Sequence, residues 1–427
     1  MKGGTIVKVV VIGGGAAGMV AAIMASRKGH QVVIVEKMRS LGRKLSITGK
    51  GRCNITNATE MENFIKNVPG NGKFLYSAFN QFTNQDAINF FNEIGVKTKV
   101  ERGERIFPVS DSALEVIDKL KKELDRQKVR VIVDTKVEDI IVQETKNENN
   151  EIIQKVKAVK VETGIIECEK VILATGGKSY PTTGSTGDGY NFAEKLGHTI
   201  ITPKPSLVPV EVYEKDIVQI QGVSLKNVGI KFLDGKKNVY EDFGEMLFTH
   251  YGVSGPTILS GSAHLLRVKN IEEKFKNRNI SINIDLKPAL TTEKLESRIQ
   301  RDFEKYTKKQ FKNSLGDLLP GKLINYIVEK SGIPEDKQTD QITREERRRL
   351  AELLKNLEFK VKKFRPIEEA IITAGGVSTK EINSSTMESK LVSGLFFAGE
   401  IIDVDAYTGG FNLQIAYSTA FVAANNL

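Results

Sequence analysis

Cysteine and histidine are both scarce in this 427-residue chain. It has two cysteines, Cys53 and Cys168, which are far apart and form no CxxC pair, and its four histidines are scattered. Structural zinc sites and disulfide frameworks need several suitably spaced ligands or half-cystines. We therefore expect neither a metal site nor a disulfide-stabilised fold. A serine hydrolase is also not indicated, because no G-x-S-x-G segment is present.

Long apolar runs are missing as well. No stretch approaches the roughly 20 apolar residues of a membrane-spanning helix. A signal peptide is not predicted, because the apolar run near the N-terminus leads into glycines instead of a small-residue cleavage site. We expect a cytoplasmic protein without a membrane partner.

The composition is that of a soluble globular protein, with 40% hydrophobic and 27% charged residues. A chain of this length predicts two or three domains. The net charge of +10 favours anionic partners, such as a dinucleotide, RNA or an acidic metabolite. Many soluble proteins are equally basic without binding nucleic acid, so the charge alone does not select the partner.

The first motif is a dinucleotide-binding pattern near the N-terminus. A β-branched run over residues 6–12 predicts a buried strand, and G-x-G-x-x-G follows at the start of a predicted helix. Gly13 permits the tight turn, Gly15 lets the backbone approach a pyrophosphate, and Gly18 lets helix and strand pack closely. A second predicted strand ends at Glu36, about 20 residues on, where a carboxylate accepts from a ribose hydroxyl. Glu36 also disfavours a 2′-phosphate at this site.

A second glycine-rich motif lies near the C-terminus. Residues 394–400 predict a short apolar strand that ends in Ala-Gly-Glu, and Gly409–Asn412 begin an Ala-rich helix. This arrangement resembles the second FAD signature of the glutathione-reductase-like flavoproteins. In that family the acid, here Glu400, meets the ribityl chain. The last helix points its N-terminus at the flavin pyrimidine, where reduction gathers negative charge.

A third motif, residues 170–177, predicts a strand that runs into Ala-Thr-Gly-Gly, a recurrent crossover in such flavoproteins. The glycines at 184–189 begin another predicted helix, but no strand immediately precedes them. No second G-x-G-x-x-G with a trailing acid occurs, so a dedicated NAD(P)H domain is not predicted. FAD is favoured over NAD because only FAD accounts for all three motifs.

Four further segments closely resemble the BaiN/YhiN-like family of bacterial FAD-binding flavoproteins: residues 41–57 (LGRKLSITGKGRCNITN), 248–256, 373–377 and 403–414 (DVDAYTGGFNLQ). The resemblance implies an α/β fold, with a Rossmann-type, glutathione-reductase-like FAD domain that carries an inserted mainly-β domain and a small helical domain. The expected ranges are 1–197 with 366–427 for the discontinuous FAD domain, 198–290 with 358–365 for the mainly-β substrate domain, and 291–357 for the helical insert.

The motifs and the family resemblance together define the residues expected to bind FAD. The cation-rich segment 43–54 is suited to the diphosphate or to the substrate face of the flavin, although a solvated basic loop is the alternative. The expected residues are Gly13, Gly15, Ala16, Ala17, Gly18, Glu36, Lys37, Arg43, Lys44, Thr48, Gly49, Arg52, Cys53, Asn54, Val137, Ala174, Thr175, Gly176, Gly177, Gly399, Glu400, Asp405, Gly409, Gly410, Phe411 and Asn412.

Three residues are candidates for catalysis. Cys53 is a candidate redox thiol or proton donor, with a packed, inert thiol as the alternative. His250 lies in a Gly/Ser/Pro-rich segment and is a candidate general acid, with a hydrogen-bonded structural histidine as the alternative. Tyr407 directly precedes the predicted flavin-facing helix.

The family resemblance implies a reductase of activated C=C bonds, with NAD(P)H as the expected transient electron donor. Two substrates are associated with it: uridine in large-subunit ribosomal RNA, which becomes dihydrouridine, and steroid or bile-acid enones. Residues 291–365 contain 19 Lys and Arg against 13 Asp and Glu, which favours RNA. A solvated helix face explains the same charges, because acids alternate with the cations. A small-molecule enone or amine oxidoreductase, and a non-catalytic flavin-bound RNA or assembly factor, remain alternatives, and the oligomeric state stays open.

Overall fold

The structure is a computed structural model that describes residues 5–146 and 149–427. The chain forms two compact units. Unit 1 combines Met1–Ser206 with Ile367–Leu427, and unit 2 is Leu207–Pro366. Unit 1 is therefore assembled from both ends of the sequence, as the paired glycine motifs predict.

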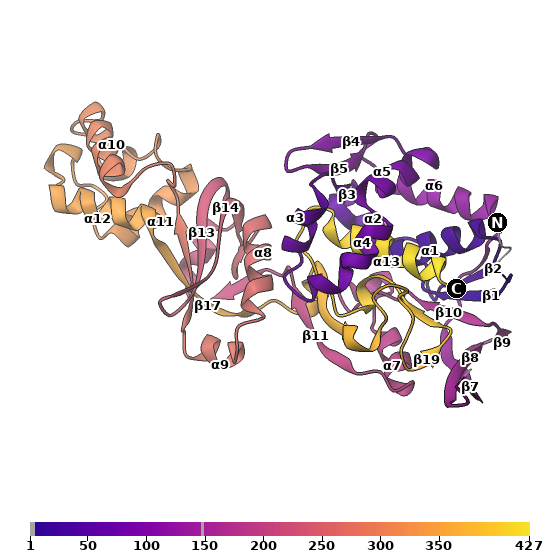
Figure 1. Ribbon diagram of the computed structural model, residues 1–427. Coiled ribbons are helices and arrows are strands. Elements are labelled where there is room, and N and C mark those ends of the chain that lie inside the picture. Colours follow the sequence, from indigo (N-terminus) through magenta and orange to yellow (C-terminus); the bar gives the residue numbers. More distant parts are fainter. Residues whose placement is uncertain (1–4, 147–148) are drawn as a thin grey trace. The chain divides into compact units, whose positions relative to one another are not determined.

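Unit 1 contains a five-stranded parallel sheet, of which Figure 1 labels β1, β2 and β10. Its strand order is β20-β10-β1-β2-β6, with bounds Leu395–Phe397, Lys170–Leu173, Lys8–Ile12, Gln31–Val35 and Arg130–Ile132. Every neighbouring pair is parallel. The buried Val and Ile runs of β1 and β2 agree with a sheet that is covered on both faces. The Rossmann-type α/β fold expected from the sequence is confirmed.

The helices α1 (Ala16–Arg27) and α13 (Phe411–Asn425) pack against each other. Both are buried around most of their circumference, which explains their uniformly apolar, Ala-rich sequences. The helix α6 (Ala113–Arg126) has one apolar face and packs on α1. The shorter helices of unit 1 are α2 (Arg43–Ile47), α3 (Met61–Lys66), α4 (Tyr76–Gln81), α5 (Asn84–Glu93) and α7 (Asp188–Lys195).

Smaller sheets complete unit 1. A four-stranded sheet contains β19 (Val392–Ser393), β8 (Ile152–Val161), β7 (Val137–Lys146) and β9 (Gly164–Glu167). A three-stranded sheet contains β3 (Thr56–Asn57), β5 (Arg105–Pro108) and β4 (Thr98–Glu101). The antiparallel pair β11 (Ile200–Ser206) and β18 (Ile372–Val377) stands where the chain leaves unit 1 and where it returns.

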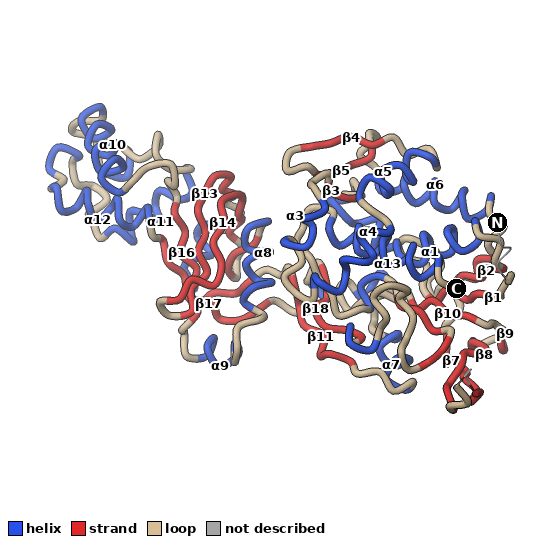
Figure 2. Tube along the Cα trace, in the orientation of Figure 1, coloured by secondary structure: helices blue, strands red, loops and turns tan. Residues whose placement is uncertain are grey.

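Unit 2 contains a closed barrel with the strand order β12-β15-β14-β13-β16-β17 (Figure 2). The strands are Val210–Val212, Gly252–Ser254, Lys237–Phe248, Ser224–Asp234, Ile280–Asp285 and Leu357–Phe364, in that order. Helices α8 (Pro256–Leu265) and α9 (Ile271–Lys276) lie between barrel strands in sequence, and α10 (Thr292–Lys305), α11 (Gly321–Ser331) and α12 (Arg344–Lys355) are inserted between β16 and β17.

One continuous apolar core joins the barrel to the inserted helices. It includes Phe232 and Phe359 of the barrel together with Phe303 and Tyr326 of the helices. Thr291 and Thr343 cap α10 and α12 by accepting from the backbone N–H of Lys294 and Glu346. The helices therefore fall in the range where the sequence predicts a helical insert, and its separation from the barrel as a domain of its own stays a prediction. No helix in the described ranges has the length and apolar character needed to cross a membrane.

Candidate functional site

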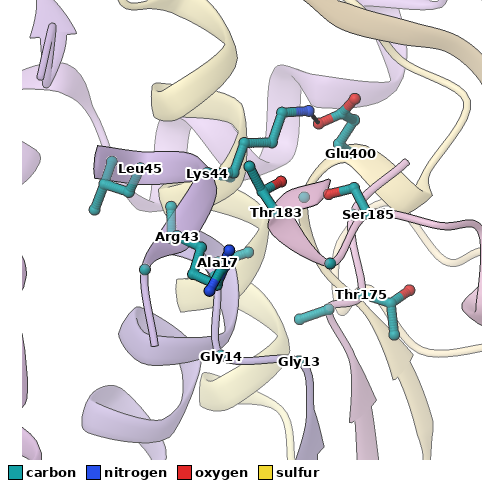
Figure 3. A pocket seen from close by; sticks show the side chains of 18 of the residues that line it. Gly13, Gly14, Ala17, Arg43, Lys44, Leu45, Thr175, Thr183, Ser185 and Glu400 are labelled. Carbon is teal, nitrogen blue, oxygen red and sulfur yellow. Dashed lines mark hydrogen bonds and ion pairs between the residues drawn. The ribbon is translucent and has the colours of Figure 1, made fainter. Parts of the chain in front are cut away.

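The main cavity of unit 1 lies at the carboxyl ends of the parallel strands, where ligands bind in open α/β sheets (Figure 3). The segments that follow β1, β2, β10 and β20 all contribute to its wall. It contains about 990 Å³ of space free of protein atoms, part of it open to solvent.

The glycines after β1 leave room for a ligand. A Cβ on Gly15 would meet no atom within 4 Å, whereas a Cβ on Gly18 would stand 1.8 Å from the carbonyl oxygen of Gly13. Gly15 therefore opens the cavity, and Gly18 permits the close packing of α1 on β1. The first turn of α1 has no side-chain cap and no acidic residue, and Ala16 and Ala17 line the cavity. Its free N–H groups and positive dipole end suit a diphosphate.

Glu36 ties the end of β2 to the loop after β1. Its Oε2 accepts from the backbone N–H of Gly14 at 2.7 Å, and its Oε1 accepts from that of Met38 at 2.8 Å. Glu36 also lines a smaller neighbouring pocket together with Lys37 and Val137. The two pockets share Gly13, Glu36, Thr175 and Gly184, so they are neighbours, and we call the two together the hollow.

Lys37 is paired in this smaller pocket. Its ammonium lies 2.7 Å from Asp188 Oδ2 and also donates to Thr186. Burial alone would raise the pKa of Asp188, but the hydrogen bond and charge of Lys37 outweigh it and hold that pKa below its usual value. The pair joins the end of β2 to the start of α7 beside the pocket.

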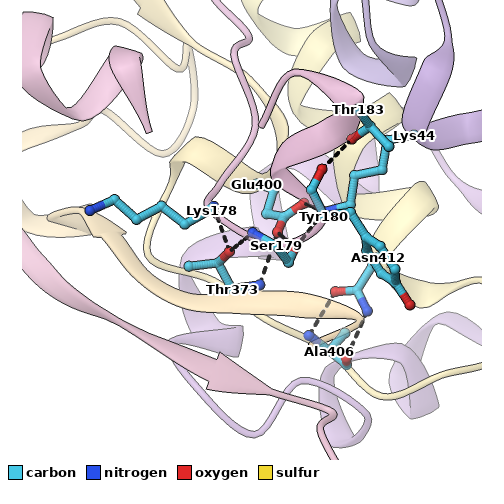
Figure 4. A network of polar contacts seen from close by, with 9 residues as sticks. All are labelled: Lys44, Lys178, Ser179, Tyr180, Thr183, Thr373, Glu400, Ala406 and Asn412. Atoms are coloured by element: carbon cyan, nitrogen blue, oxygen red, sulfur yellow. Dashed lines mark hydrogen bonds and ion pairs between the residues drawn. The ribbon is translucent and has the colours of Figure 1, made fainter. Parts of the chain in front are cut away.

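Glu400 and Lys44 meet at the other end of the cavity (Figure 4). Lys44 Nζ lies 2.6 Å from Glu400 Oε2 and donates to Ser179 Oγ at 2.6 Å. Glu400 Oε1 accepts from Ser179 Oγ and from the backbone N–H of Thr373, each at 2.9 Å. The carboxylate is therefore held by three segments far apart in sequence.

The N-terminus of α13 lies beside this network. Gly410 adopts a left-handed conformation with φ 99°, and a Cβ there would stand 2.3 Å from the carbonyl oxygen of Thr56. Asn412 holds the preceding loop by donating to the carbonyl of Ala406 at 2.7 Å and accepting from its N–H at 2.9 Å. The first turn of α13 has no acidic residue, and Asn412 and Leu413 line the cavity. Its dipole therefore favours negative charge at this end.

These residues fit FAD. An uncapped helix start stands at each end of the hollow, one suited to the diphosphate and one to the charge that gathers on a reduced flavin. Glu36 and Glu400 line the cavity with carboxylate oxygens, which are acceptors of the kind that the ribose and ribityl hydroxyls of FAD need. The open space over Gly15 is the approach that a diphosphate requires.

Most residues expected to bind FAD lie in this hollow. Those that line the main cavity are Gly13, Gly15, Ala16, Ala17, Glu36, Arg43, Lys44, Thr48, Ala174, Thr175, Gly176, Gly399, Glu400 and Asn412. Lys37 and Val137 line the smaller pocket. The remaining expected residues line neither pocket: Gly18, Gly49, Arg52, Cys53, Asn54, Gly177, Asp405, Gly409, Gly410 and Phe411.

Arg52 is held away from the cavity by the β4–β5 hairpin. Its guanidinium stacks over the ring of Phe107 at 4.2 Å and pairs with Glu101 and Asp111, each at 2.5 Å. Lys99 pairs with the same two carboxylates. The network fixes the segment after α2. Arg52 lines neither pocket and contributes to the cavity wall only through this segment.

Other expected residues act through packing. A Cβ on Gly177 would stand 2.4 Å from Thr373 Oγ1. Asp405 is buried and accepts from Ser206 Oγ at 2.7 Å. Asn54 Oδ1 is buried without a hydrogen-bond partner in the described part of the chain.

Of the three catalytic candidates, Cys53 and Tyr407 lie in unit 1 and His250 lies in unit 2. The Cys53 thiol is fully buried, and burial raises its pKa to about 12, which keeps it protonated. Tyr407 is half-buried just before α13, and its N–H donates to the carbonyl of Asn67 at 2.9 Å. His250 is exposed in the turn between β14 and β15 of unit 2. Their catalytic roles stay predictions.

Several cavity residues carry no signal that the sequence analysis used. Gly14 lies within the first motif, and Gly184 and Ser185 lie in a glycine-rich segment that was interpreted only as a helix start. The apolar residues have no chemical signature of their own, because Ala and Leu are common in any core. The additional lining residues are Gly14, Ser40, Gly42, Leu45, Thr183, Gly184, Ser185, Ile371, Ile372, Ala398, Leu413 and Ala416.

The parallel sheet and this hollow define a flavoprotein with a Rossmann-type FAD domain. The match of residues 7–426 to a family described as "HI0933-like protein Rossmann domain" extends this assignment to nearly the whole chain, which belongs to that family. The expected BaiN/YhiN-like membership and FAD as cofactor are thereby confirmed. The protein is an FAD-dependent oxidoreductase.

Three curated relatives align along almost their full length. The chain is 32% identical over 418 residues to "Ribosomal RNA dihydrouridine synthase" of Haemophilus influenzae, with 97% of each chain covered. It is 30% identical over 416 residues to "3-dehydro-bile acid delta(4,6)-reductase" of Clostridium scindens, again with 97% of each covered. It is 28% identical to "Ribosomal RNA dihydrouridine synthase" of Escherichia coli, with 98% of this chain and 97% of the relative covered.

Among solved structures, 3-ketosteroid delta1-dehydrogenase from Sterolibacterium denitrificans matches with a TM-score of 0.51, and 99% of each chain is covered. The sequence identity is 13%, so this likeness supports the fold alone.

Proposed function

We propose that the protein reduces a C=C bond conjugated with a carbonyl, and that its substrate is uridine in large-subunit ribosomal RNA, which becomes dihydrouridine. The observation that carries the proposal is the end-to-end similarity to relatives whose names describe this type of reduction. Dihydrouridine differs from uridine by two hydrogens across the C5=C6 bond. A Δ4 double bond of a 3-oxo steroid is conjugated with its carbonyl in the same way, and a Δ6 double bond extends that conjugation when the Δ4 bond is present.

The reduction needs a hydride at one carbon and a proton at the other. Reduced FAD supplies the hydride when bound, so the chain must supply the proton. Tyr407 is the leading candidate donor, because it is half-buried directly before the helix start that lines the cavity. His250 is the second candidate. Tyr407→Phe should leave reduction of the flavin by the donor intact and slow its reoxidation by substrate at least ~100-fold. His250→Gln is the parallel test, and a variant that slows both half-reactions equally does not mark the proton donor.

The electron donor in this proposal is NAD(P)H, bound only transiently. A second dinucleotide motif is missing from the sequence, so the nicotinamide nucleotide has no domain of its own. Stopped-flow reduction should saturate with NADH or NADPH at a rate that does not depend on added substrate.

RNA would be held by exposed cations of unit 2. Many cations in the range 291–365 are paired with carboxylates, including Lys305 with Asp317, Lys312 with Glu335 and Arg348 with Glu352. A cation that is paired with a carboxylate attracts an RNA phosphate less strongly than an unpaired one. Within the described residues, the exposed cations of this range without a carboxylate partner are Lys294, Arg301, Lys308, Lys309, Lys322, Arg349 and Lys362.

The two sets of cations give a matched comparison. The triple change Lys294→Gln, Arg301→Gln and Lys308→Gln should weaken binding to ribosomal RNA fragments and lower the slope of log K against log salt by ~2, since each phosphate contact contributes ~0.7–0.9. The control triple Lys305→Gln, Lys312→Gln and Arg348→Gln removes the same charge from paired positions. Equal effects of the two triples would contradict specific phosphate contacts and support a solvated helix face.

The catalytic proposal is tested by anaerobic reoxidation of the reduced protein. Ribosomal RNA from a strain that lacks the gene should reoxidise the flavin and gain dihydrouridine, whereas RNA from the parent strain should not. Turnover of a free 3-oxo-Δ4 steroid with no effect of either RNA would reject the RNA substrate. It would favour the second candidate, a small-molecule enone reductase, which the 30% identity to the bile-acid enzyme supports. Failure of both substrates would favour a non-catalytic flavin-bound factor.

A further inference from the structure

We propose that Lys44 is an electrostatic positioning residue that raises the reduction potential of the bound flavin, and that Glu400, Ser179 and Thr373 hold its ammonium in place for this task. The inference rests on the FAD site alone and does not depend on which substrate the protein reduces.

The placement of Lys44 is the first observation. It belongs to the first turn of α2, yet its side chain reaches across to the segment after β20 (Figures 3 and 4). The pair is largely withdrawn from water, with side-chain exposures of 22% for Lys44 and 12% for Glu400. Both residues line the main cavity.

The hydrogen-bond inventory is the second observation. An ammonium has three N–H donors, and within the described residues Lys44 uses two of them, on Glu400 Oε2 and Ser179 Oγ. Glu400 Oε1 accepts from Ser179 Oγ and Thr373 N, while Oε2 accepts from Lys44. One N–H of Lys44 and one lone pair of Glu400 Oε2 therefore remain for a ligand in the cavity.

Stability alone does not explain the pair. Withdrawing two charges from water costs about as much as their attraction returns, so such pairs contribute little net stability. The hydrogen bonds from Ser179 and Thr373 orient the carboxylate of Glu400 and leave one lone pair of its Oε2 open to a ligand in the cavity. This degree of fixed orientation is typical of a group that acts on a ligand.

The charge balance at this end of the cavity gives the direction of the effect. The carboxylate of Glu400 by itself opposes the negative charge that reduction places on a flavin. Lys44 neutralises that carboxylate and leaves the dipole of α13 to act on the flavin. Removal of the cation should therefore weaken binding of reduced FAD more than binding of oxidised FAD.

The test is the midpoint potential of the FAD-loaded protein, measured by anaerobic spectroelectrochemical titration. Lys44→Met should lower the potential by ~30 mV or more, which is a tenfold change in the ratio of the affinities for the two redox states. Lys44→Arg should restore most of the difference. Arg27→Met is the matched control: it removes a cation of similar exposure, 23% against 22%, from a close ion pair with Glu123 at the last residue of α1, far from the cavity that the first turn of α1 lines, and it should leave the potential unchanged.

A second measurement covers a variant that loses FAD during purification. The dissociation constants of oxidised and reduced FAD are then measured separately on the apoprotein by anaerobic fluorescence titration. A loss at least tenfold greater for reduced FAD supports the proposal. An equal loss for both redox states, or an unchanged potential in Lys44→Met, shows a structural ion pair and overturns it.

Discussion

The carboxylate of Glu36 accepts a hydrogen bond from the backbone N–H of Gly14 at 2.7 Å. This contact joins the end of β2 to the glycine loop after β1, across the neighbouring carboxyl ends of two parallel strands. Glu36 therefore holds the glycine loop in shape, and because its carboxylate also lines the cavity, we expect it to accept from a ribose hydroxyl of FAD.

Replacement of Glu36 should weaken FAD binding without unfolding the protein. Glu36→Ala removes hydrogen bonds to a charged acceptor worth ~1.5–3 kcal/mol, so the dissociation constant of FAD should rise ~10- to 100-fold. The measurement is fluorescence titration of apoprotein with FAD. Glu169→Ala is the control, because Glu169 accepts from the backbone N–H of Lys8 at 2.8 Å at the opposite edge of the same sheet. Equal losses in both variants would contradict a direct role for Glu36.

Gly15 and Gly18 should fail in different ways. Gly15→Ala places a methyl group in open cavity space, so the apoprotein should keep its thermal stability and lose at least ~10-fold in FAD affinity. Gly18→Ala forces a Cβ to 1.8 Å from the carbonyl oxygen of Gly13, so the fold itself should be destabilised. Gly321→Ala, which also meets nothing within 4 Å, controls for the added methyl. A stable Gly15→Ala protein with normal FAD affinity would show that the diphosphate does not bind at this loop.

Cys53 should behave as an inert, packed residue. Burial raises the pKa of Cys53 and of Cys168 to about 12, so neither thiol should react with Ellman's reagent at pH 8 until the protein is unfolded. Cys53→Ala should change reoxidation by substrate no more than ~2-fold, with a small loss of stability. A large loss confined to the reoxidation of the flavin by substrate would instead identify Cys53 as the proton donor.

Glu123 should make unit 1 sensitive to acid. Burial favours a higher pKa for this side chain, which is 5% exposed, but hydrogen bonds from Arg126, Arg27 and Gln127 outweigh it and lower the pKa. A carboxyl whose pKa is lower in the folded state contributes stability above its unfolded value of ~4.3 and loses that contribution as pH falls below it. Glu123→Gln should therefore unfold at lower urea concentration than wild type at pH 7. The difference should shrink between pH 5 and pH 3; a difference that is constant with pH would contradict this linkage.

The backbone of the site could be predicted because its signals are local. The glycines at 13, 15 and 18, the acid at 36 and the glycines before α13 each occur at fixed spacings from a strand or helix, and parallel strands bring their carboxyl ends to one edge. Each of these spacings can be recognised within a short segment of the sequence.

The side-chain network could not be predicted in the same way. Lys44 and Glu400 are 356 positions apart, and Ser179 and Thr373 reach them from two further segments. Arg52 belongs to the cation-rich segment expected at the diphosphate, but it pairs instead with Glu101 of β4 and with Asp111, which follows β5. Pairing over such separations depends on the completed fold.

The most direct test of the whole account is the dihydrouridine content of ribosomal RNA, measured by mass spectrometry in a strain that lacks the gene and carries either the wild-type protein or Gly15→Ala. We expect a large-subunit uridine to be unreduced in the deletion strain, wild-type protein to restore its reduction, and a stably produced Gly15→Ala protein to restore it poorly. An unchanged dihydrouridine content in the deletion strain would contradict the RNA substrate.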